Sequence, residues 1–259
     1  METWRLLDVS LSPPEQNLAL EEAVLRTVGS RLAPGTVRFW KNQNVVVIGR
    51  HQDPDLEINA VATRKYGTVV VRRFTGGGAV YHDDGNLNWS ISLRDDHPLV
   101  RPWGLNLLRL YQILSAGVTE GLKSMGVPSC FVPPGDIQIG GRKVSGTAAA
   151  RKWGAVFLHG TLLVCSRIPL IEEILDSTEV ARPETKAIRS VRKPMVSLTE
   201  ALGRRVSTAD AKFYLASGFE QAFDIRLVPG ELTPMERSCL SLPLSRTNRD
   251  ASFAGVPNA

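Results

Sequence analysis

Two arginines, three glycines and a strand-forming run follow one another in the stretch Arg72-Arg73-Phe74-Thr75-Gly76-Gly77-Gly78-Ala79-Val80-Tyr81-His82-Asp83. The β-branched run Thr68–Arg73 and the run Ala79–His82 predict two strands joined by the glycines. Glycine accepts positive φ and lets a ligand lie against bare main chain, where successive N–H groups form an anion-binding concavity. Arg72 and Arg73 alternate along the strand, so at least one is expected to face that ligand. Arg73 can grip a phosphate or carboxylate through paired hydrogen bonds.

A second stretch of small residues carries a lysine, Gly140-Gly141-Arg142-Lys143-Val144-Ser145-Gly146-Thr147-Ala148. We expect a hairpin here, with strands over Asp136–Ile139 and Arg142–Ser145. Lys143 is either a solvated surface charge or a cation that neutralises charge on a carboxylate beside a phosphate. Asp136 either orients this lysine or holds a magnesium ion. The two stretches together predict a pocket for an anionic acyl or nucleotidyl group.

The predicted strands come in adjacent, hairpin-joined groups with helices between the groups. The glycine loop matches neither G-x-G-x-x-G nor G-x-x-x-x-G-K-[ST], so a dinucleotide-binding fold or a P-loop is not predicted. The pattern indicates an α+β domain of mixed, largely antiparallel sheets flanked by helices. Further strands are predicted over Thr36–Trp40, Asn44–Ile48, Leu87–Leu93 and Ala155–Val164. Helices are predicted over Leu18–Val28, Ile58–Tyr66, Trp103–Met125, Pro169–Leu175, Ser207–Phe223 and Thr233–Leu240.

Three of these elements carry packing expectations. The strand Leu87–Leu93 alternates, so its apolar side chains Trp89, Ile91 and Leu93 share one face and the polar Asn88, Ser90 and Ser92 the other. In the helix Trp103–Met125, an apolar stripe is expected to lie in the core, made by Leu105, Leu108, Leu110 and Ile113. Ser207 and Asp210 predict a capping box at a helix start.

The composition is that of an ordinary globular protein, with 259 residues, 43% hydrophobic residues and a net charge of +5. No concentrated Lys/Arg run suggests a nucleic-acid partner, and the mild basicity suits an acidic protein or an anionic substrate. The cysteines are three, Cys130, Cys165 and Cys239, without C-x-x-C spacing, so a zinc site or a disulfide framework is not expected. No membrane-length apolar run and no signal-peptide core occur, which predicts a cytoplasmic protein without a membrane partner.

The remaining candidate residues are histidines and loops. His82 and His159 have no metal-ligand spacing, so each is expected to be a hydrogen-bonded wall residue. Ser177–Pro194 is polar and rich in cations, and we expect a mobile loop that closes over the site. Residues 1–240 are expected to form one domain, followed by a disordered tail over 241–259.

At these residues the chain resembles the lipoate–protein ligase family, within the superfamily that includes biotin ligases and octanoyltransferases. The biotin-ligase form of the glycine loop differs, so biotin is set aside. Four segments over roughly residues 1–235 carry the resemblance: Phe39-Trp40 with Val47–Gln52; Arg72–Asp83; Gly135-Asp136-Ile137 with Gly141–Gly146; and Leu158–Leu163.

The resemblance implies an ATP- and magnesium-dependent enzyme that converts lipoate to lipoyl-AMP. It then transfers the lipoyl group to one lysine of an acceptor, such as a lipoyl domain of a 2-oxoacid dehydrogenase complex or the glycine-cleavage H protein. It also implies Lys143 as the catalytic lysine and Asp136 as a magnesium ligand. The implied contacts to nucleotide or acyl-adenylate are Arg73, Gly76, Gly77, Gly78, Ala79, Val80, Tyr81, His82, Lys143 and His159.

Two departures from the family pattern leave alternatives open. Many of these ligases have Asn-Asp where this chain has Gly135-Asp136. The chain also has no room for the small C-terminal domain of two-domain ligases. A separate accessory subunit for adenylation is therefore one expectation, and transfer alone is another.

A rival interpretation lies within the same fold. One class of octanoyltransferase uses a cysteine thioester and no ATP, with its cysteine shortly before the equivalent of Lys143. Cys130 lies thirteen residues before Lys143. It is either that nucleophile, which would need a lowered thiol pKa, or a buried apolar residue. A third hypothesis is a non-catalytic protein that binds lipoyl domains.

Overall fold

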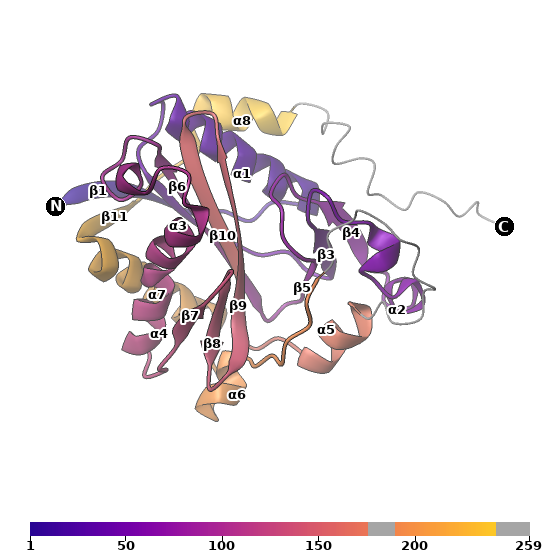
Figure 1. Ribbon diagram of the computed structural model, residues 1–259. Helices are drawn as coiled ribbons and strands as arrows, with labels where there is room; N and C mark the ends of the chain where they lie inside the picture. The colour runs from indigo at the N-terminus through magenta and orange to yellow at the C-terminus, as the bar shows by residue number, and fades with distance from the viewer. Residues whose placement is uncertain (176–189, 242–259) are drawn as a thin grey trace.

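The computed structural model describes residues 1–175 and 190–241, and it combines an eight-stranded sheet with a three-stranded one (Figure 1). The strands are β1 (Glu2–Asp8), β2 (Thr36–Trp40), β3 (Val45–Ile48), β4 (Val69–Arg72), β5 (Val80–His82), β6 (Asn86–Arg94), β7 (Cys130–Val132), β8 (Asp136–Ile139), β9 (Arg142–Lys152), β10 (Ala155–Leu163) and β11 (Ile225–Pro229). The helices are α1 (Pro14–Gly29), α2 (Ala60–Lys65), α3 (Leu107–Leu114), α4 (Ala116–Ser124), α5 (Ile168–Ile174), α6 (Leu198–Leu202), α7 (Thr208–Phe223) and α8 (Pro234–Ser241), with 3-10 turns over Pro54–Leu56 and Arg101–Trp103.

The sheet topology confirms the predicted α+β class. The large sheet has the order β11-β1-β2-β6-β10-β9-β8-β7 and the small one β4-β3-β5. Neighbouring strands run antiparallel from β2 through to β7 in the large sheet, whereas β1 pairs in parallel with both β2 and β11. In the small sheet β3 pairs in parallel with β4 and antiparallel with β5.

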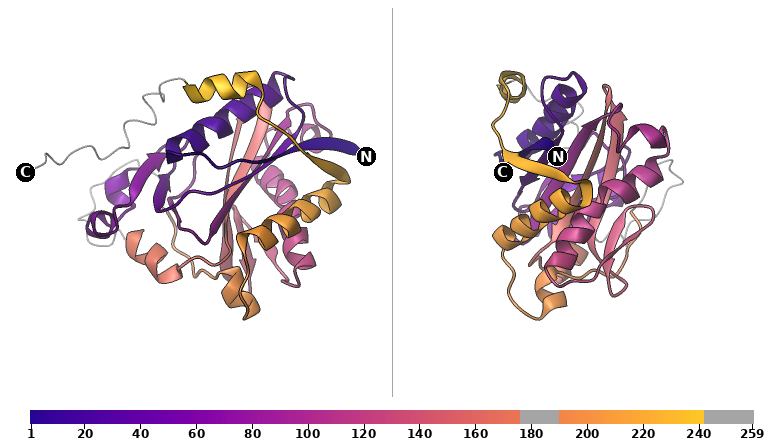
Figure 2. Two further views of the ribbon diagram at one scale, coloured as in Figure 1. Left: turned by 180° about the vertical axis from the view of Figure 1, so that it is seen from behind. Right: turned by 90° about the vertical axis from the view of Figure 1, so that its left-hand side faces the viewer.

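Helices cover both faces of the large sheet, with α1 and α8 on one side and α4 and α7 on the other (Figure 2). The predicted alternation in β6 is confirmed, because Trp89, Ile91 and Leu93 belong to the core cluster that includes α4 and α7. The polar side chains of β6 are buried as well, since α1 packs on their face. On this buried face the Asn86 amide donates to Asn88 Oδ1 at 3.0 Å, whereas Asn86 Oδ1, Asn88 Nδ2 and Ser92 Oγ have no hydrogen-bond partner in the described part of the chain.

The prediction of one helix over Trp103–Met125 is wrong. Gly104 has a φ of 51°, and Asn106 starts α3 by accepting a hydrogen bond from the Arg109 N–H. Leu105 and Leu108 are 86% and 49% exposed, so they are not part of the expected core stripe. Apolar residues at helical spacing do not by themselves show where a turn interrupts the helix. Nor do they show which of these residues the turn leaves exposed to solvent.

Three strands and one helix were not predicted, namely β1, β7, β11 and α6. The strand β1 contains Arg5, a residue untypical of a buried strand, whose guanidinium pairs with the buried carboxylate of Glu236 in α8 at 2.7 Å. Both β7 and β11 are short; β7 pairs with the next strand along the chain, β8, whereas β11 pairs with β1 at the other end of the described chain. The capping box of Ser207 and Asp210 is confirmed.

Parts of two expectations lie outside the described residues. The predicted mobile loop falls mostly on 176–189, and the predicted tail on 242–259. Among the residues that the structure does describe, no helix is both long and apolar enough to cross a membrane.

The helices α4 and α7 cross at a backbone-to-backbone contact. A Cβ added to Gly218 in α7 would lie 2.3 Å from both the Gly117 oxygen and the Gly121 nitrogen of α4. These neighbours are main-chain atoms and cannot rotate away, so only glycine fits. The crossing fixes how α4 and α7 sit on the sheet.

We expect Gly218→Ala to lower the free energy of unfolding by about 3 kcal/mol, because the methyl group forces the two helices apart. Urea unfolding followed by circular dichroism measures this loss. Gln221→Ala, at an exposed position of the same helix, is the control and should change stability by less than about 0.5 kcal/mol. Equal stability of the two variants would contradict the packing argument.

Candidate functional site

A cavity of about 660 Å³ lies between the large sheet and the small sheet. Of the residues predicted from the sequence, its lining includes Arg73, Gly77, Gly78, Ala79, Val80, His82, Asp136, Lys143 and His159. Other lining residues come from α1, β2, α3, β9 and the segment after residue 189, among them Leu18, Trp40, Leu107, Tyr111, Thr147, Ser190 and Lys193. The two glycine-containing stretches of the sequence therefore meet at one cavity.

Three of the predicted residues do not line the cavity, namely Gly76, Tyr81 and Cys130. Tyr81 lies between Val80 and His82 on β5, so its side chain points to the opposite face of the small sheet. There its hydroxyl donates a hydrogen bond to Asn44 Oδ1 at 3.0 Å, and its ring joins the core cluster of that sheet. A direct ligand contact from the Tyr81 side chain is thus not favoured.

Arg73 organises the glycine loop from inside. Its Nη2 donates to the carbonyl oxygens of Gly76 and Gly78, both at 2.7 Å, and its Nε donates to Thr75 Oγ1 at 3.0 Å. Its Nη1 donates to the Val47 oxygen at 3.1 Å. Burial lowers the pKa of this guanidinium to about 10, and the chain's own carbonyls engage each of its nitrogens. The expected grip of Arg73 on a phosphate is therefore replaced by a grip on the loop.

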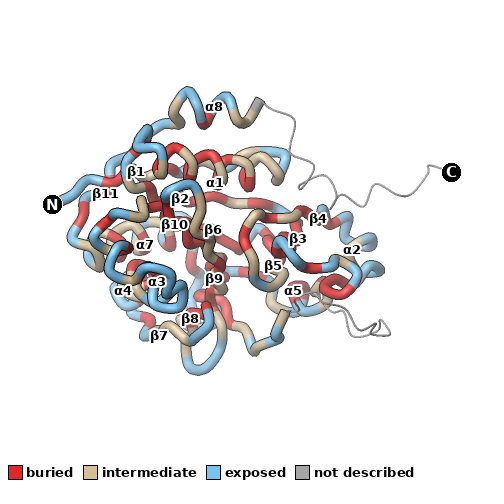
Figure 3. Tube along the Cα trace, turned by 45° about the horizontal axis from the view of Figure 1, so that its top comes forward, coloured by how far each residue is buried: buried red, intermediate tan, exposed pale blue. Residues whose placement is uncertain are grey.

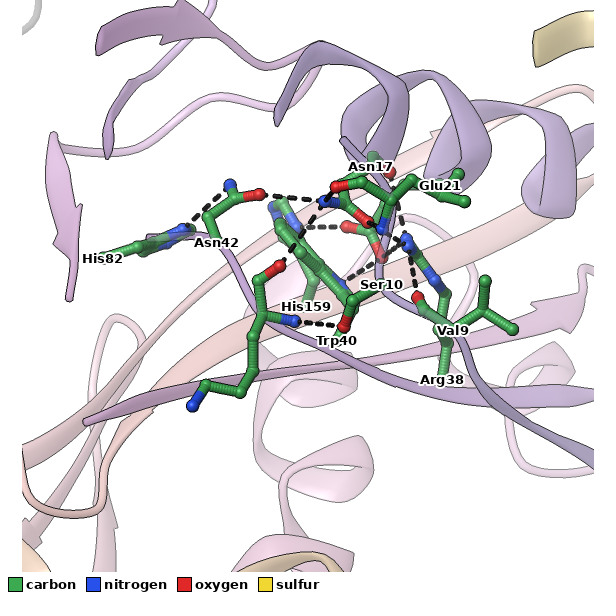
Figure 4. Close-up of polar contacts among 11 residues, drawn as sticks. Val9, Ser10, Asn17, Glu21, Arg38, Trp40, Asn42, His82 and His159 are labelled. Carbon is green, nitrogen blue, oxygen red and sulfur yellow. Dashed lines mark hydrogen bonds and ion pairs between the residues drawn. The ribbon is translucent and has the colours of Figure 1, made fainter. Parts of the chain in front are cut away.

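A chain of buried hydrogen bonds joins that loop to α1, and Figure 4 shows the part between His159 and Glu21. Thr75 Oγ1 lies 2.8 Å from His159 Nε2, and His159 Nδ1 lies 2.9 Å from the Glu21 carboxylate. The natural assignment places the imidazole proton on Nδ1, where it is donated to Glu21, while Nε2 accepts from the Thr75 hydroxyl. Burial is the main cause that lowers the pKa of His159. His159 is thus a hydrogen-bonded wall residue, as predicted.

The Glu21 carboxylate also contacts two side chains of β2. Its Oε1 lies 3.0 Å from the Trp40 indole nitrogen and 3.4 Å from Arg38 Nη1. Glu21 and Arg38 are each 1% exposed, and burial lowers the pKa of Arg38 to about 10. One carboxylate on α1 therefore compensates a buried cation and fixes the orientation of two rings in the cavity wall.

His82 forms the end of a second polar chain. The Asn17 amide donates to Asn42, whose own amide lies 3.3 Å from His82 Nδ1 (Figure 4). With Nδ1 as acceptor the proton belongs on Nε2, and this buried atom has no hydrogen-bond partner in the described part of the chain. Burial, followed by the nearby cations, lowers the pKa of His82 to about 3, so the ring is neutral. The His82 Nε2–H is therefore an unpaired donor in the cavity wall, as is the amide nitrogen of Asn88, another lining residue.

A cluster of three charges lies on the other wall. Asp136 is buried, with Oδ1 2.9 Å from Lys143 Nζ and Oδ2 2.5 Å from Lys193 Nζ. The Lys143 side chain lies across Gly146, where an added Cβ would be 2.6 Å from Nζ. One carboxylate between two ammonium groups leaves the cluster with a net charge of about +1, which suits a ligand that carries or develops negative charge.

The segment 190–196 joins the two walls of the cavity. Ser190 Oγ accepts hydrogen bonds from the Ala79 N–H at 2.8 Å and from the Gln52 amide at 3.1 Å. At the other end, the Lys143 N–H donates to Pro194 and the Val196 N–H donates to Lys143. The sequence prediction did not find Ser190 or Lys193 as site residues, because their contacts join parts of the chain that are far apart.

The predicted magnesium site does not fit these contacts. Both oxygens of Asp136 are bound by lysine ammonium groups, which repel a divalent cation. Over residues 1–175 and 190–241 no cluster of three or more His, Cys, Asp and Glu side chains is arranged to hold a metal ion. The Ala79 N–H of the glycine loop is also bonded internally, to Ser190. The charged groups that the described part of this wall offers to a ligand are therefore the two lysine ammonium groups.

Cys130 is exposed at the start of β7, so the alternative that it is a buried apolar residue is wrong. In the sheet register Cys130 pairs with Gln138, and Gln138 pairs with Lys143. Residues paired in this way share one face of a sheet. With strands about 4.8 Å apart, the Cα atoms of Cys130 and Lys143 are separated by about 10 Å. The thiol thus lies beside the charged cluster and outside the cavity.

We expect Glu21→Gln to lower the free energy of unfolding by about 3 kcal/mol, because it leaves the buried Arg38 guanidinium without its carboxylate. Chemical denaturation measures the change. Glu22→Gln is the matched control, since Glu22 is partly exposed and pairs with Arg26 within one helix; it should cost less than about 0.5 kcal/mol. Similar losses in both variants would argue against a special role of Glu21.

The lowered pKa of His82 predicts a pH dependence of stability. Between its ordinary pKa of 6.5 and about 3, the unfolded chain binds a proton that the folded chain does not. Stability therefore falls as the pH drops below 6.5, by up to about 1.4 kcal/mol per pH unit from this group. Unfolding of wild type and His82→Gln at pH 7, 6, 5 and 4 should show a shallower decline in the variant. Parallel curves would mean that His82 does not titrate in this way.

The comparisons with known proteins agree with this geometry. A family model described as the lipoyl protein ligase A/B catalytic domain matches residues 13–220. "Octanoyltransferase LipM" of Symbiobacterium thermophilum is 33% identical over 260 residues, covering 91% of this chain and 92% of that protein. "Lipoate--protein ligase 1" of Staphylococcus aureus is 33% identical over 193 residues, covering 74% of this chain and 56% of that protein. The crystal structure of a lipoate-protein ligase A bound with ATP has a TM-score of 0.76 and 26% identity, and 93% of each chain is covered. The chain therefore belongs to the lipoyl protein ligase A/B catalytic domain family, an enzyme family of octanoyltransferases and lipoate ligases.

Proposed function

We propose that the chain is an acyltransferase that moves an octanoyl group from a thioester carrier to a lysine of an acceptor domain through a thioester on Cys130. The observation that carries the proposal is the place of the exposed Cys130 thiol, in one cross-strand row with Lys143. Lys143 in turn lines the cavity. A thiol outside the cavity but in register with a cavity lysine suits a nucleophile that attacks a carbonyl group held at Lys143.

The cavity residues give the acyl chain its position. Leu18, Trp40, Val47 and Val80 offer apolar surface in the cavity, while Lys143 belongs to the charged cluster on the other wall. An octanoyl chain that fills the apolar part places its carbonyl carbon toward Lys143. The ammonium group then donates a hydrogen bond to the carbonyl oxygen, where negative charge develops during attack.

The chemistry needs two balanced steps. The Cys130 thiolate attacks the carbonyl carbon of the donor thioester, the donor thiolate leaves, and it takes up the proton that Cys130 lost. The neutral amine of the acceptor lysine then attacks the Cys130 thioester, the carbon–sulfur bond breaks, and an amide forms. The proton of the amine returns to the Cys130 sulfur. Lys143 stabilises the oxyanion of each step and is not consumed.

The relatives support this reaction. The match to the octanoyltransferase from Symbiobacterium thermophilum takes in 91% of this chain, and the match to the Staphylococcus aureus ligase 74%. The poor fit of magnesium to Asp136 points the same way, since an adenylating enzyme needs charge compensation at ATP. In this reading no accessory domain or subunit is required, and the acceptor is a lipoyl domain or an H-protein-like domain.

The second candidate is the ATP-dependent lipoate ligase that the sequence favours. Its support is the likeness to named ligases and to the ATP-bound ligase structure. If ATP binds, the loop Gly77–Val80 and Lys143 are the residues placed to contact it. A separate adenylating subunit would then supply what this chain lacks.

Intact mass of an acceptor lipoyl domain distinguishes these candidates. With octanoylated acyl carrier protein and no ATP, we expect an octanoyl mass increase on the acceptor and a transient one on the enzyme. With lipoate and Mg-ATP instead, we expect no increase. A lipoyl increase only with ATP would establish a self-sufficient ligase, and transfer from lipoyl-AMP alone would point to a missing subunit.

Three variants test the assigned residues in the same assay. Cys130→Ser should reduce transfer from the carrier protein by at least about 10³-fold and abolish the enzyme adduct, because the thioester cannot form. Cys165→Ser, which changes another exposed free cysteine, should retain full activity. Lys143→Met should form the enzyme adduct about 10²-fold more slowly than wild type, because the hydrogen-bond donor to the oxyanion is lost. Full activity of Cys130→Ser would rule out the thioester route.

A further inference from the structure

The entrance of the cavity carries an unusual amount of exposed apolar surface. Leu105, Leu107 and Leu108 are 86%, 42% and 49% exposed, and Val191 is 78% exposed. Leu107, Leu108 and Val191 also line the cavity. Figure 3 shows the chain around the start of α3 as mostly exposed. Exposed apolar residues that cluster around an opening are typical of a binding surface, whereas single exposed apolar residues occur on any protein surface.

Cations predominate beside these residues, and the nearby carboxylate of Asp95 is paired with Arg151, which also donates a hydrogen bond to the Gly104 carbonyl. Arg101 and Arg109 are exposed on the same stretch, and Lys193 follows Val191 on the other side of the opening. No aspartate or glutamate occurs between Asp96 and Glu120, nor in the segment 190–199. Among the described residues that line the cavity, the one carboxylate is Asp136, which is buried and bound by two lysines. The surface is therefore apolar at its centre and cationic around it, which is the arrangement that complements an acidic protein.

We propose that the surface of Leu105, Leu107, Leu108, Val191 and Arg101 is the docking site for the acidic carrier domain that delivers the acyl group. The proposal rests on the acyltransferase function proposed above. The donor brings an acyl chain on a flexible thiol arm, and this chain must pass Leu107 and Leu108 to enter the cavity. The acceptor presents only a lysine and has no apolar arm to guide. The apolar entrance thus fits the donor better than the acceptor.

Direct binding tests the surface without any turnover. Fluorescence anisotropy of labelled, octanoylated acyl carrier protein is measured against wild type, Leu105→Asp, Arg101→Glu and Phe213→Asp. Leu105 does not line the cavity, so its substitution should leave the fold and the acyl site intact. We expect Leu105→Asp to weaken binding by about tenfold or more, and Arg101→Glu to weaken it and reduce its salt dependence.

Phe213→Asp is the matched control, because Phe213 is 70% exposed on the remote helix α7 and should bind the carrier as wild type does. Thermal unfolding of each variant confirms the fold. In kinetics, Leu105→Asp should raise KM for the carrier protein, while the formation of the enzyme adduct from the small donor octanoyl-pantetheine stays unchanged.

Several results would overturn the docking site. Leu105→Asp would bind the carrier with unchanged affinity if the donor docks elsewhere. A change in molar mass on light scattering would identify the occupant as a second copy of the chain, and a defect only in the acceptor step would identify it as the acceptor. If no transfer occurs from any donor but Leu105→Asp still abolishes carrier binding, the surface stands and the proposed acyltransferase function fails.

Discussion

The buried carboxylate of Glu21 is the constraint on which the arrangement of the cavity depends. It stands on α1 and is compensated by Arg38 and by the imidazole N–H of His159. An ionised group in the interior is tolerated only when it is paired and hydrogen-bonded, so these three side chains fix one another. His159 is hydrogen-bonded to Thr75, and the Thr75 hydroxyl accepts a hydrogen bond from Arg73, so the positions of these side chains also depend on Glu21. The conformation of the glycine loop is thus tied to helix α1 through the side chain of His159.

The polar face of β6 follows from the same arrangement. A strand with serines and an asparagine on one face ordinarily presents that face to water. Here α1 covers it, and in the described part of the chain Asn86 Oδ1, Asn88 Nδ2 and Ser92 Oγ are buried without a hydrogen-bond partner. The cavity wall also carries the unpaired N–H of His82. A ligand oxygen or sulfur at that point would complete the hydrogen bonding.

The opposite wall depends on charge rather than on burial. Asp136 draws Lys143 from β9 and Lys193 from the segment 190–196 into contact. Because one negative charge is shared by two positive ones, Lys143 is held in place without losing its ability to stabilise an anion. The same segment binds the glycine loop through Ser190, so the cation and the loop keep a fixed distance across the cavity. Such preorganisation is what catalysis of acyl transfer requires.

The sequence by itself determined the features that depend on neighbouring residues. Alternation in β6, the capping box at Ser207 and the glycine loop are set by side chains within a few residues of one another, and each was predictable for that reason. The motifs at Arg73 and Lys143 also carried the family, and the structure brings both to one cavity. That Lys143 and His159 line the same cavity followed from the family resemblance rather than from any local pattern.

Only the tertiary structure decided which groups face each other over long separations. Glu21 and His159 are 138 residues apart, and Lys193 and Asp136 are 57 apart. No local pattern fixes such pairs, because strand pairing and helix packing create them. The same holds for Leu105, whose helical spacing indicated the core although the turn at Gly104 leaves it in solvent. The exposure of Cys130, on an edge strand that forms only by pairing with β8, was likewise a consequence of the assembled sheet.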